Sequence, residues 1–165
     1  MQNKGFKYPD TKAYQFIIDE FNKRGITLHD LAKIVHKMEI DYIPELTVEK
    51  CARVLINEMH KRELMNNVMV GLELDRLAEE KKLKEPLLSI IRNDAGVFGV
   101  DEVLALQIAN IYGTIGSTNF GYLDRVKYGL IKKFDEDKQH VNTFLDDLLG
   151  AIVAAACAKL AHEYA

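Results

Sequence analysis

The segment FLDDLLGAIVAAACAKLAHEYA, at positions 144–165, constrains the fold more than any other part of the chain. Asp146 and Asp147 stand at the start of a run built mainly from Leu, Ile, Val, Ala and Gly. Ionised carboxylates are costly to bury unless something pairs with them. The small residues let a neighbouring helix come close, so we expect either a core helix or a contact between subunits.

Helical periodicity dominates the rest of the chain, and no strand-like alternation persists. Prolines occur only at positions 9, 44 and 86. Thr27 and Thr47 are the expected N-caps of two helices, each with an acidic residue in the following turn. We therefore predict a compact, all-α, single-domain bundle of about six or seven helices over residues 1–165. The expected segments are 10–24, 27–38, 47 to the charged run EEKKLKE, 86–91, 101–112, 117–136 and 143–163.

The bulk composition is that of a globular protein, with 48% hydrophobic and 28% charged residues. The formal net charge of -3 gives no electrostatic case for nucleic-acid binding. Cys51 and Cys157 lie in helical patterns and are expected to be buried free thiols. The first residues, MQNKGFKYPD, lack the apolar core of a signal peptide. These features predict a cytoplasmic protein.

Residues 103–123 carry no charge, and the run is long enough to cross a bilayer. It nevertheless contains Gln107, Asn110 and Asn119, whose side chains would be expensive to place in hydrocarbon. We interpret the run as a buried hairpin.

Acidic residues recur in the second half at positions where they look out of place. Asp101 and Glu102 directly precede an uncharged helix, and Asp124 precedes Lys127 by one helical turn. Asp124 and Asp135 are eleven residues apart, so on one continuous helix they would share a face about 16 Å apart along the axis. At that separation one metal ion would not bind both.

Clusters of carboxylate oxygens suit Mg²⁺ or Mn²⁺, particularly when a substrate supplies phosphate oxygens. Asp124, Asp146 and Asp147 are candidate metal ligands, with Lys127 or Lys132 as a clamp for phosphate. The alternative is helix capping, because acidic residues are favoured at helix N-termini and most of these lie near one. The spacing alone leaves both interpretations open.

Three segments in order, DAGVFGVDE, FGYLDRVKYGLIKKFD and LDDLLGAIVAA, resemble the phosphatidylglycerophosphatase A family. The resemblance covers roughly residues 94–155. It implies removal of phosphate from phosphatidylglycerophosphate with Mg²⁺. The positions that match the family's functional residues are Asp94, Asp101, Glu102, Asp124, Lys127, Asp135, Asp146 and Asp147.

The chain also departs from the family pattern. Tyr128 stands where the family has a proline, and Val100 replaces an aromatic residue. Family members sit in the membrane, whereas the run around Asn110 is polar. The resemblance therefore implies a soluble, divergent branch, cytoplasmic and at most peripheral to the inner face of the membrane.

The leading hypothesis is a Mg²⁺-dependent phosphatase acting on a phosphomonoester, either a small molecule or a lipid headgroup. Its catalytic residues would be Asp101, Glu102 and Asp147, and Lys127 would bind phosphate. Asp124 and Asp146 would join Asp147 in holding the metal. We also expect a homo-oligomer.

Two other functional classes stay open. One is a non-catalytic helical protein that binds a metal or a phosphorylated ligand. The other is an all-α nucleotide pyrophosphatase, which typically carries E-x-x-E followed by E-x-x-D. The first half offers only ELDRLAEE, a poor match to that pattern.

Overall fold

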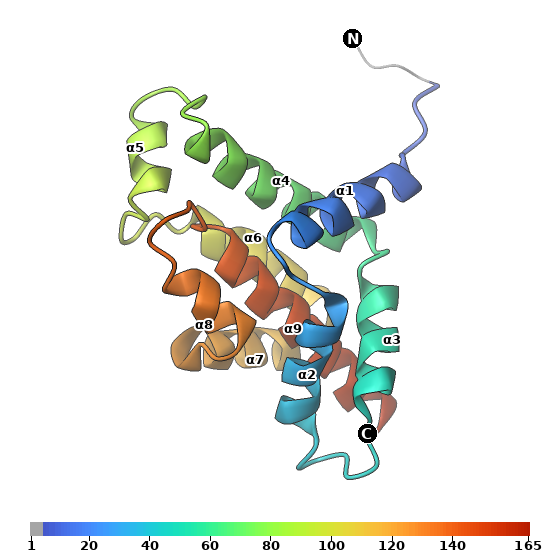
Figure 1. Ribbon diagram of the computed structural model, residues 1–165. Helices are drawn as coiled ribbons and strands as arrows, with labels where there is room; N and C mark the ends of the chain where they lie inside the picture. Colours follow the sequence, from blue (N-terminus) through green and yellow to red (C-terminus); the bar gives the residue numbers. More distant parts are fainter. Residues whose placement is uncertain (1–4) are drawn as a thin grey trace.

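The computed structural model describes residues 5–165, and that part of the chain contains helices but no strands (Figure 1). The all-α prediction is confirmed. The helices are α1 (Asp10–Lys23), α2 (Leu28–Glu39), α3 (Val48–Glu58), α4 (Arg62–Glu79), α5 (Leu87–Arg92), α6 (Val100–Ala109), the 3₁₀ helix η1 (Asn110–Tyr112), α7 (Thr114–Val126), α8 (Leu130–Asp135) and α9 (Leu145–Glu163).

The described α-helices outnumber the six or seven expected because two predicted helices are broken. The segment beginning at Thr47 is interrupted between Glu58 and Arg62, where α3 gives way to α4. The segment 117–136 is interrupted because Lys127 adopts a left-handed conformation with φ 35°, and Gly129 follows with φ 63°. Asp124 and Asp135 consequently lie on different helices, and the expectation of a shared helix face was wrong.

The predicted caps at the two threonines are confirmed. The Thr27 side chain accepts a hydrogen bond from the backbone N–H of Asp30 at 3.1 Å. The Thr47 side chain does the same for Lys50 at 3.2 Å. These bonds satisfy N–H groups that would otherwise lack partners at the starts of α2 and α3.

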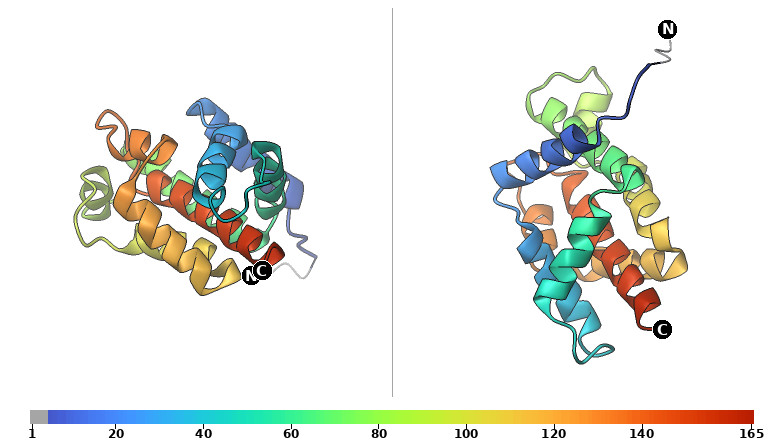
Figure 2. Two further views of the ribbon diagram at one scale, coloured as in Figure 1. Left: turned by 90° about the horizontal axis from the view of Figure 1, so that it is seen from below. Right: turned by 90° about the vertical axis from the view of Figure 1, so that its right-hand side faces the viewer.

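Helix α9 runs through the middle of the molecule, surrounded by the other helices (Figures 1 and 2). It contacts α2, α3, α4, α6, α7 and α8. Every residue from Leu145 to Ala158 is buried, so α9 is the core helix of the fold. Its Ala and Gly side chains permit this close packing on all sides. The alternative, that α9 forms a contact between subunits, was wrong.

The predicted hairpin over residues 103–123 forms from α6, η1 and α7. It is only partly buried, since Val103, Ile115 and Tyr122 are exposed. No helix within residues 5–165 combines the length and the apolarity needed to cross a bilayer. Both cysteines are buried free thiols, as expected.

The hairpin depends on a close approach at Gly116. A Cβ added there would lie 1.9 Å from the carbonyl oxygen of Ala109, whereas a Cβ at Gly121 of the same helix would meet nothing within 4 Å. We expect Gly116→Ala to lower the free energy of unfolding by about 1–3 kcal/mol, because backbone must shift. Gly121→Ala should be neutral or stabilise by up to about 1 kcal/mol. Urea denaturation of the two variants checks this, and equal stabilities would contradict it.

Candidate acidic phosphate site

The acidic pair at the start of α9 is held in place from another helix. Asp75 on α4 is buried, and its carboxylate accepts hydrogen bonds from the backbone N–H groups of Phe144 and Leu145 at 3.1–3.2 Å. These are the two residues directly before Asp146 and Asp147. Asp75 therefore caps α9 from a distance in sequence and fixes where the acidic pair begins.

Asp147 lies beside the first turn of α6. Oxygen atoms of Asp101, Glu102 and Asp147 all fall within 4.8 Å of one another. Gly99 adopts φ 75° immediately before α6, a conformation that glycine tolerates and that turns the chain into the helix. One oxygen of Asp101, Oδ1, is buried and has no hydrogen-bond partner within residues 5–165.

Lys127 forms ion pairs with three other acidic residues of this region. Its Nζ lies 2.8 Å from Asp135, 2.8 Å from Asp146 and 3.3 Å from Asp124. The left-handed backbone of Lys127 ends α7 and separates it from α8, which brings the carboxylates of two helices to one ammonium group. Lys127 thus offsets part of the negative charge that α7, α8 and α9 bring together.

A hollow of about 210 Å³ joins the two groups of residues. Asp94 and Val97, both with positive φ, belong to the loop that covers one side of it. All six residues of the predicted site line this hollow: Asp101, Glu102, Asp124, Lys127, Asp146 and Asp147. Lys132, the alternative phosphate clamp, does not line it and instead lies 3.5 Å from Glu136.

Three carboxyl groups of the site have pKa values above the usual range for aspartate. Burial, followed by the nearby charge of Asp146, raises the pKa of Asp147 to about 8. Burial raises the pKa of Asp146 to about 6, although Lys127 opposes the shift. Burial and the neighbouring Glu102 carboxyl raise the pKa of Asp101 to about 6. Burial alone would lower the pKa of Lys127, but its hydrogen bonds to Asp135 and Asp146 hold that pKa well above the usual value.

These features fit a divalent cation held by Asp101, Glu102 and Asp147. Three carboxylates this close repel one another unless protons or a cation neutralise them. Within residues 5–165 the buried Oδ1 of Asp101 accepts no hydrogen bond, so it is available as a ligand. Oxygen donors of this kind are the ligands that Mg²⁺ and Mn²⁺ prefer. The structure thus groups Asp147 with Asp101 and Glu102, whereas Asp124 and Asp146 are paired with Lys127.

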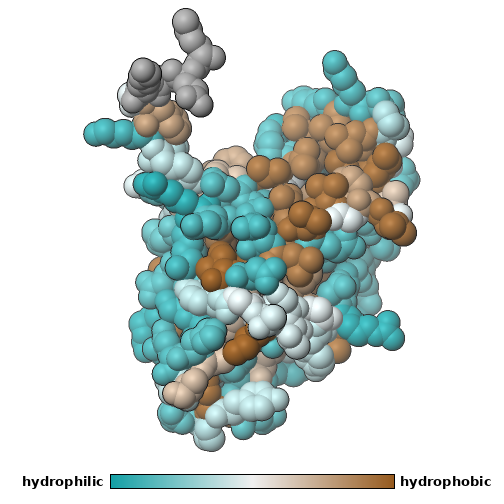
Figure 3. All heavy atoms as spheres, turned by 180° about the vertical axis from the view of Figure 1, so that it is seen from behind, coloured by the Kyte–Doolittle hydropathy of each residue, from teal (hydrophilic) through white to brown (hydrophobic). Residues whose placement is uncertain are grey.

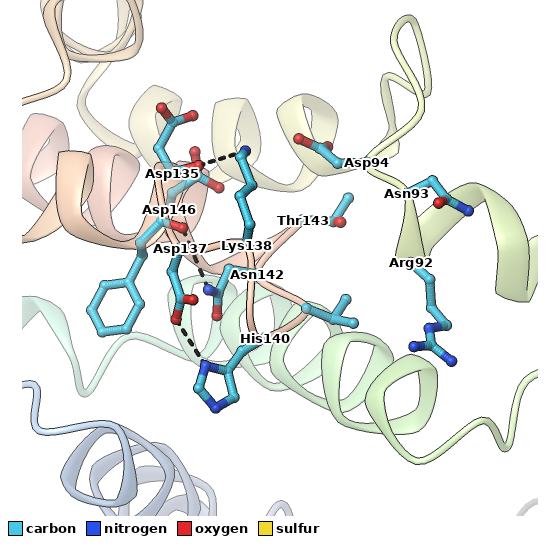
Figure 4. A pocket seen from close by; sticks show the side chains of 12 residues that line it. Arg92, Asn93, Asp94, Asp135, Asp137, Lys138, His140, Asn142, Thr143 and Asp146 are labelled. Atoms are coloured by element: carbon cyan, nitrogen blue, oxygen red, sulfur yellow. Dashed lines mark hydrogen bonds and ion pairs between the residues drawn. The ribbon is translucent and has the colours of Figure 1, made fainter.

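Sequence reasoning missed three residues near the site. Asp75 could have been found as a lone carboxylate on the buried stripe of α4, among Val68, Leu72 and Ala78. Arg92 and Lys138 line a second hollow of about 240 Å³ beside the first (Figure 4), and no motif marked them.

The segment ELDRLAEE uses its charged side chains structurally. Glu73 and Glu80 both form ion pairs with Arg76 on the surface of α4. Asp75 caps α9. None of these residues lines the acidic hollow, which gives the pyrophosphatase alternative no support.

The family model of phosphatidylglycerophosphatase A matches residues 27–162, which include the whole acidic site. The chain belongs to the phosphatidylglycerophosphatase A family. Two Bacillus subtilis relatives carry no assigned function in their names. Uncharacterized protein YpjQ is 42% identical over 96% of this chain and 89% of its own length. Uncharacterized protein YutG is 43% identical over 98% of this chain and 96% of its own length.

Two relatives of this phosphatidylglycerophosphatase A family member have solved structures, and both share its fold. The crystal structure of YpjQ superposes with a TM-score of 0.89 at 42% identity, over 95% of this chain and 98% of that one. The low temperature requirement C protein from Listeria monocytogenes gives a TM-score of 0.86 at 44% identity, over 94% and 96% of the two chains.

Proposed function

We propose that this protein is a Mg²⁺-dependent phosphatase that converts phosphatidylglycerophosphate to phosphatidylglycerol. The observation that carries the proposal is the cluster of Asp101, Glu102 and Asp147 beside Lys127 in one hollow. The family match over residues 27–162 supports the same reaction.

The position of each residue in the hollow suggests its role in the reaction. A bound cation would be held by Asp101, Glu102 and Asp147, and it would neutralise charge on the phosphate oxygens. Lys127 faces the hollow with three carboxylate partners, of which Asp124 is the most distant and the most exposed. When a phosphate oxygen approaches Lys127, the ion pair between Lys127 and Asp124 would be the one to break.

The reaction replaces one bond to phosphorus by another. Glu102 is exposed at the mouth of the hollow and would orient the attacking water. The water oxygen bonds to phosphorus while the ester P–O bond breaks, and a proton passes to the leaving alcohol. The products are inorganic phosphate and phosphatidylglycerol.

The test is phosphate release from phosphatidylglycerophosphate in detergent micelles, with Mg²⁺ and with EDTA. We expect release only with Mg²⁺. Mg²⁺ binding by isothermal titration without release from this lipid or any other phosphomonoester would overturn the proposal. That outcome would leave the non-catalytic binding protein as the better description.

An exposed apolar surface lies beside the site. Figure 3 shows apolar side chains gathered on the back of the molecule, where α5 and α6 lie. Its exposed members are Leu87, Val97, Val100, Val103 and Leu106. Val97 also lines the acidic hollow, so the surface is continuous with the site. We propose that it contacts the membrane surface and the acyl part of the lipid substrate.

Flotation with phosphatidylglycerol vesicles tests this contact. The double substitution Val100→Gln and Val103→Gln should reduce vesicle binding, whereas Tyr42→Gln, on an exposed loop residue, should not. Unchanged binding together with a lower mass in light scattering would overturn the proposal. The surface would then be the homo-oligomer contact that the sequence predicts.

A further inference from the structure

Val97 adopts a backbone conformation that is rare for valine, and it does so beside the acidic hollow. Its φ is 65°, in the left-handed region. A β-branched residue is strained there, whereas glycine and asparagine adopt this region more easily. Val97 lies in the loop between α5 and α6 and lines the hollow. The backbone at this position therefore disfavours valine.

The surroundings of Val97 disfavour valine as well. Its side chain is 103% exposed, so all of its apolar surface faces water. Apolar surface left in water forgoes the free energy that burial would provide. At this exposure the side chain gains nothing from packing within residues 5–165. Neither the backbone nor the fold explains why a valine stands here.

The loop holds Val97 at a fixed place. The backbone N–H of Ala95 donates to the carbonyl oxygen of Ile90 at 3.1 Å, which ties the loop to α5. Phe98, directly after Val97, packs edge-on against Phe144, with ring centroids 5.8 Å apart. Phe144 directly precedes α9. Val97 is thus presented to solvent from a loop that is anchored on both of its sides.

Val97 is also the point where the acidic hollow meets the exposed apolar surface. Of the five exposed members of that surface, Val97 is the one that lines the hollow. Val100, Val103 and Leu106 follow it on α6, at intervals of three residues, in the region where Figure 3 shows apolar side chains gathered. Because Val97 both lines the hollow and is fully exposed, it stands at the rim of the hollow.

We propose that Val97 inserts into the apolar part of a lipid layer while the phosphate of a lipid headgroup occupies the acidic hollow. Burial in lipid offsets the cost of an exposed and strained valine. The site consequently prefers a phosphomonoester carried on a lipid to the same headgroup free in water. This inference rests on the proposed function and names the residue that selects the lipid form of the substrate.

The kinetic test compares phosphatidylglycerophosphate in phosphatidylglycerol vesicles with its deacylated form, glycerophosphoglycerophosphate, both with Mg²⁺. Val97→Asn should lower kcat/KM for the lipid by about tenfold, because the burial of one valine is lost. The loss should lie in KM, since Val97 stands at the rim and not among the carboxylates. The value for the deacylated substrate should stay within about twofold. Equal losses on both substrates, or none on either, would overturn the inference.

Thermal unfolding tests whether the valine serves the fold instead. Asparagine tolerates the left-handed region, so Val97→Asn should raise the Tm by about 2–5 °C. A Tm below that of the wild-type protein would overturn the inference.

The matched control is Val70→Asn, on an exposed valine of α4 that does not line the acidic hollow. It should leave kcat/KM for both substrates within about twofold. A loss on the lipid as large as that for Val97→Asn would also overturn the inference.

A fluorescence measurement separates this inference from the proposed function. The sequence contains no tryptophan, so Val97→Trp places a single reporter at the rim. With phosphatidylglycerol vesicles its emission should shift to the blue, and lipid brominated on the acyl chains should quench it. Val70→Trp should show neither effect.

These fluorescence results would support the insertion of Val97 even if the wild-type protein hydrolysed neither substrate, in which case the proposed function alone would fail. Unchanged emission of Val97→Trp with vesicles would overturn the inference. A blue shift that needs no vesicles and grows with protein concentration would also overturn it, because it would indicate contact between copies of the chain.

Discussion

Replacing Asp147 by asparagine is expected to abolish phosphate release while the protein stays folded. Asparagine has nearly the same shape but carries no charge, so the cluster with Asp101 and Glu102 loses one anionic ligand. Loss of a residue that only supports a metal ligand typically costs 10–100-fold in metal affinity or activity. For a direct ligand we expect a loss of more than about 100-fold in kcat/KM. Phosphate release at saturating Mg²⁺ measures this.

The same variant should be more stable than the wild-type protein without metal. Burial raises the pKa of Asp147 to about 8 in the folded protein, whereas an aspartate in an unfolded chain has a pKa of about 3.9. The folded state therefore holds this proton more tightly than the unfolded state. The stability that the carboxyl contributes is complete below about pH 4 and is lost as the pH rises through about 8.

Asparagine does not titrate, so in EDTA the Tm of Asp147→Asn minus that of the wild-type protein should grow between about pH 4 and pH 8 and then stay level. Mg²⁺ should raise the Tm of the wild-type protein and have little effect on the variant. The control is Asp41→Asn, on an exposed turn residue, which should follow the wild-type protein throughout. Full activity of Asp147→Asn would remove Asp147 from the site.

Replacing Asp75 by alanine is expected to produce a large loss of stability. The substitution leaves the N–H groups of Phe144 and Leu145 buried without acceptors. Each such group costs about 1–3 kcal/mol, so the free energy of unfolding should fall by about 2–5 kcal/mol. For a chain of this size that lowers the Tm by roughly 5–15 °C. Differential scanning calorimetry measures the change.

Asparagine at position 75 keeps one carbonyl oxygen as an acceptor, so Asp75→Asn should lose less than Asp75→Ala. Asp19→Ala is the matched control on the surface of α1, where Asp19 accepts a hydrogen bond from Gln15. It should change stability by less than about 0.5 kcal/mol. If Asp75→Ala were as stable as this control, Asp75 would not be the cap of α9.

Local signals in the sequence predicted local structure well. Both threonine caps, the all-α class and the apolar α9 follow from rules that act within one or two turns. The break at Lys127 was missed because it contains no proline. Its left-handed residue is a lysine, a residue type that seldom adopts that conformation.

The grouping of the site residues follows from packing between distant helices. The order of motifs marked acidic residues that the fold brings together, since all of them except Asp135 line one hollow. Spacing could not indicate that Asp147 meets Asp101 while Asp146 meets Lys127, because this depends on how α6, α7 and α9 pack. Arg92 was missed because a single arginine after an apolar stretch carries no periodic signal.

The central place of α9 also matters while the chain is being made. During synthesis α1 to α8 leave the ribosome before α9. The earlier helices therefore lack the segment that fills the space between them until α9 has been made. Until then their apolar faces are open to water and to one another, which favours association of incomplete chains. The acidic residues at the start of α9 are made as part of that same segment, so the core and the full acidic cluster are completed together, after α1 to α8 have been made.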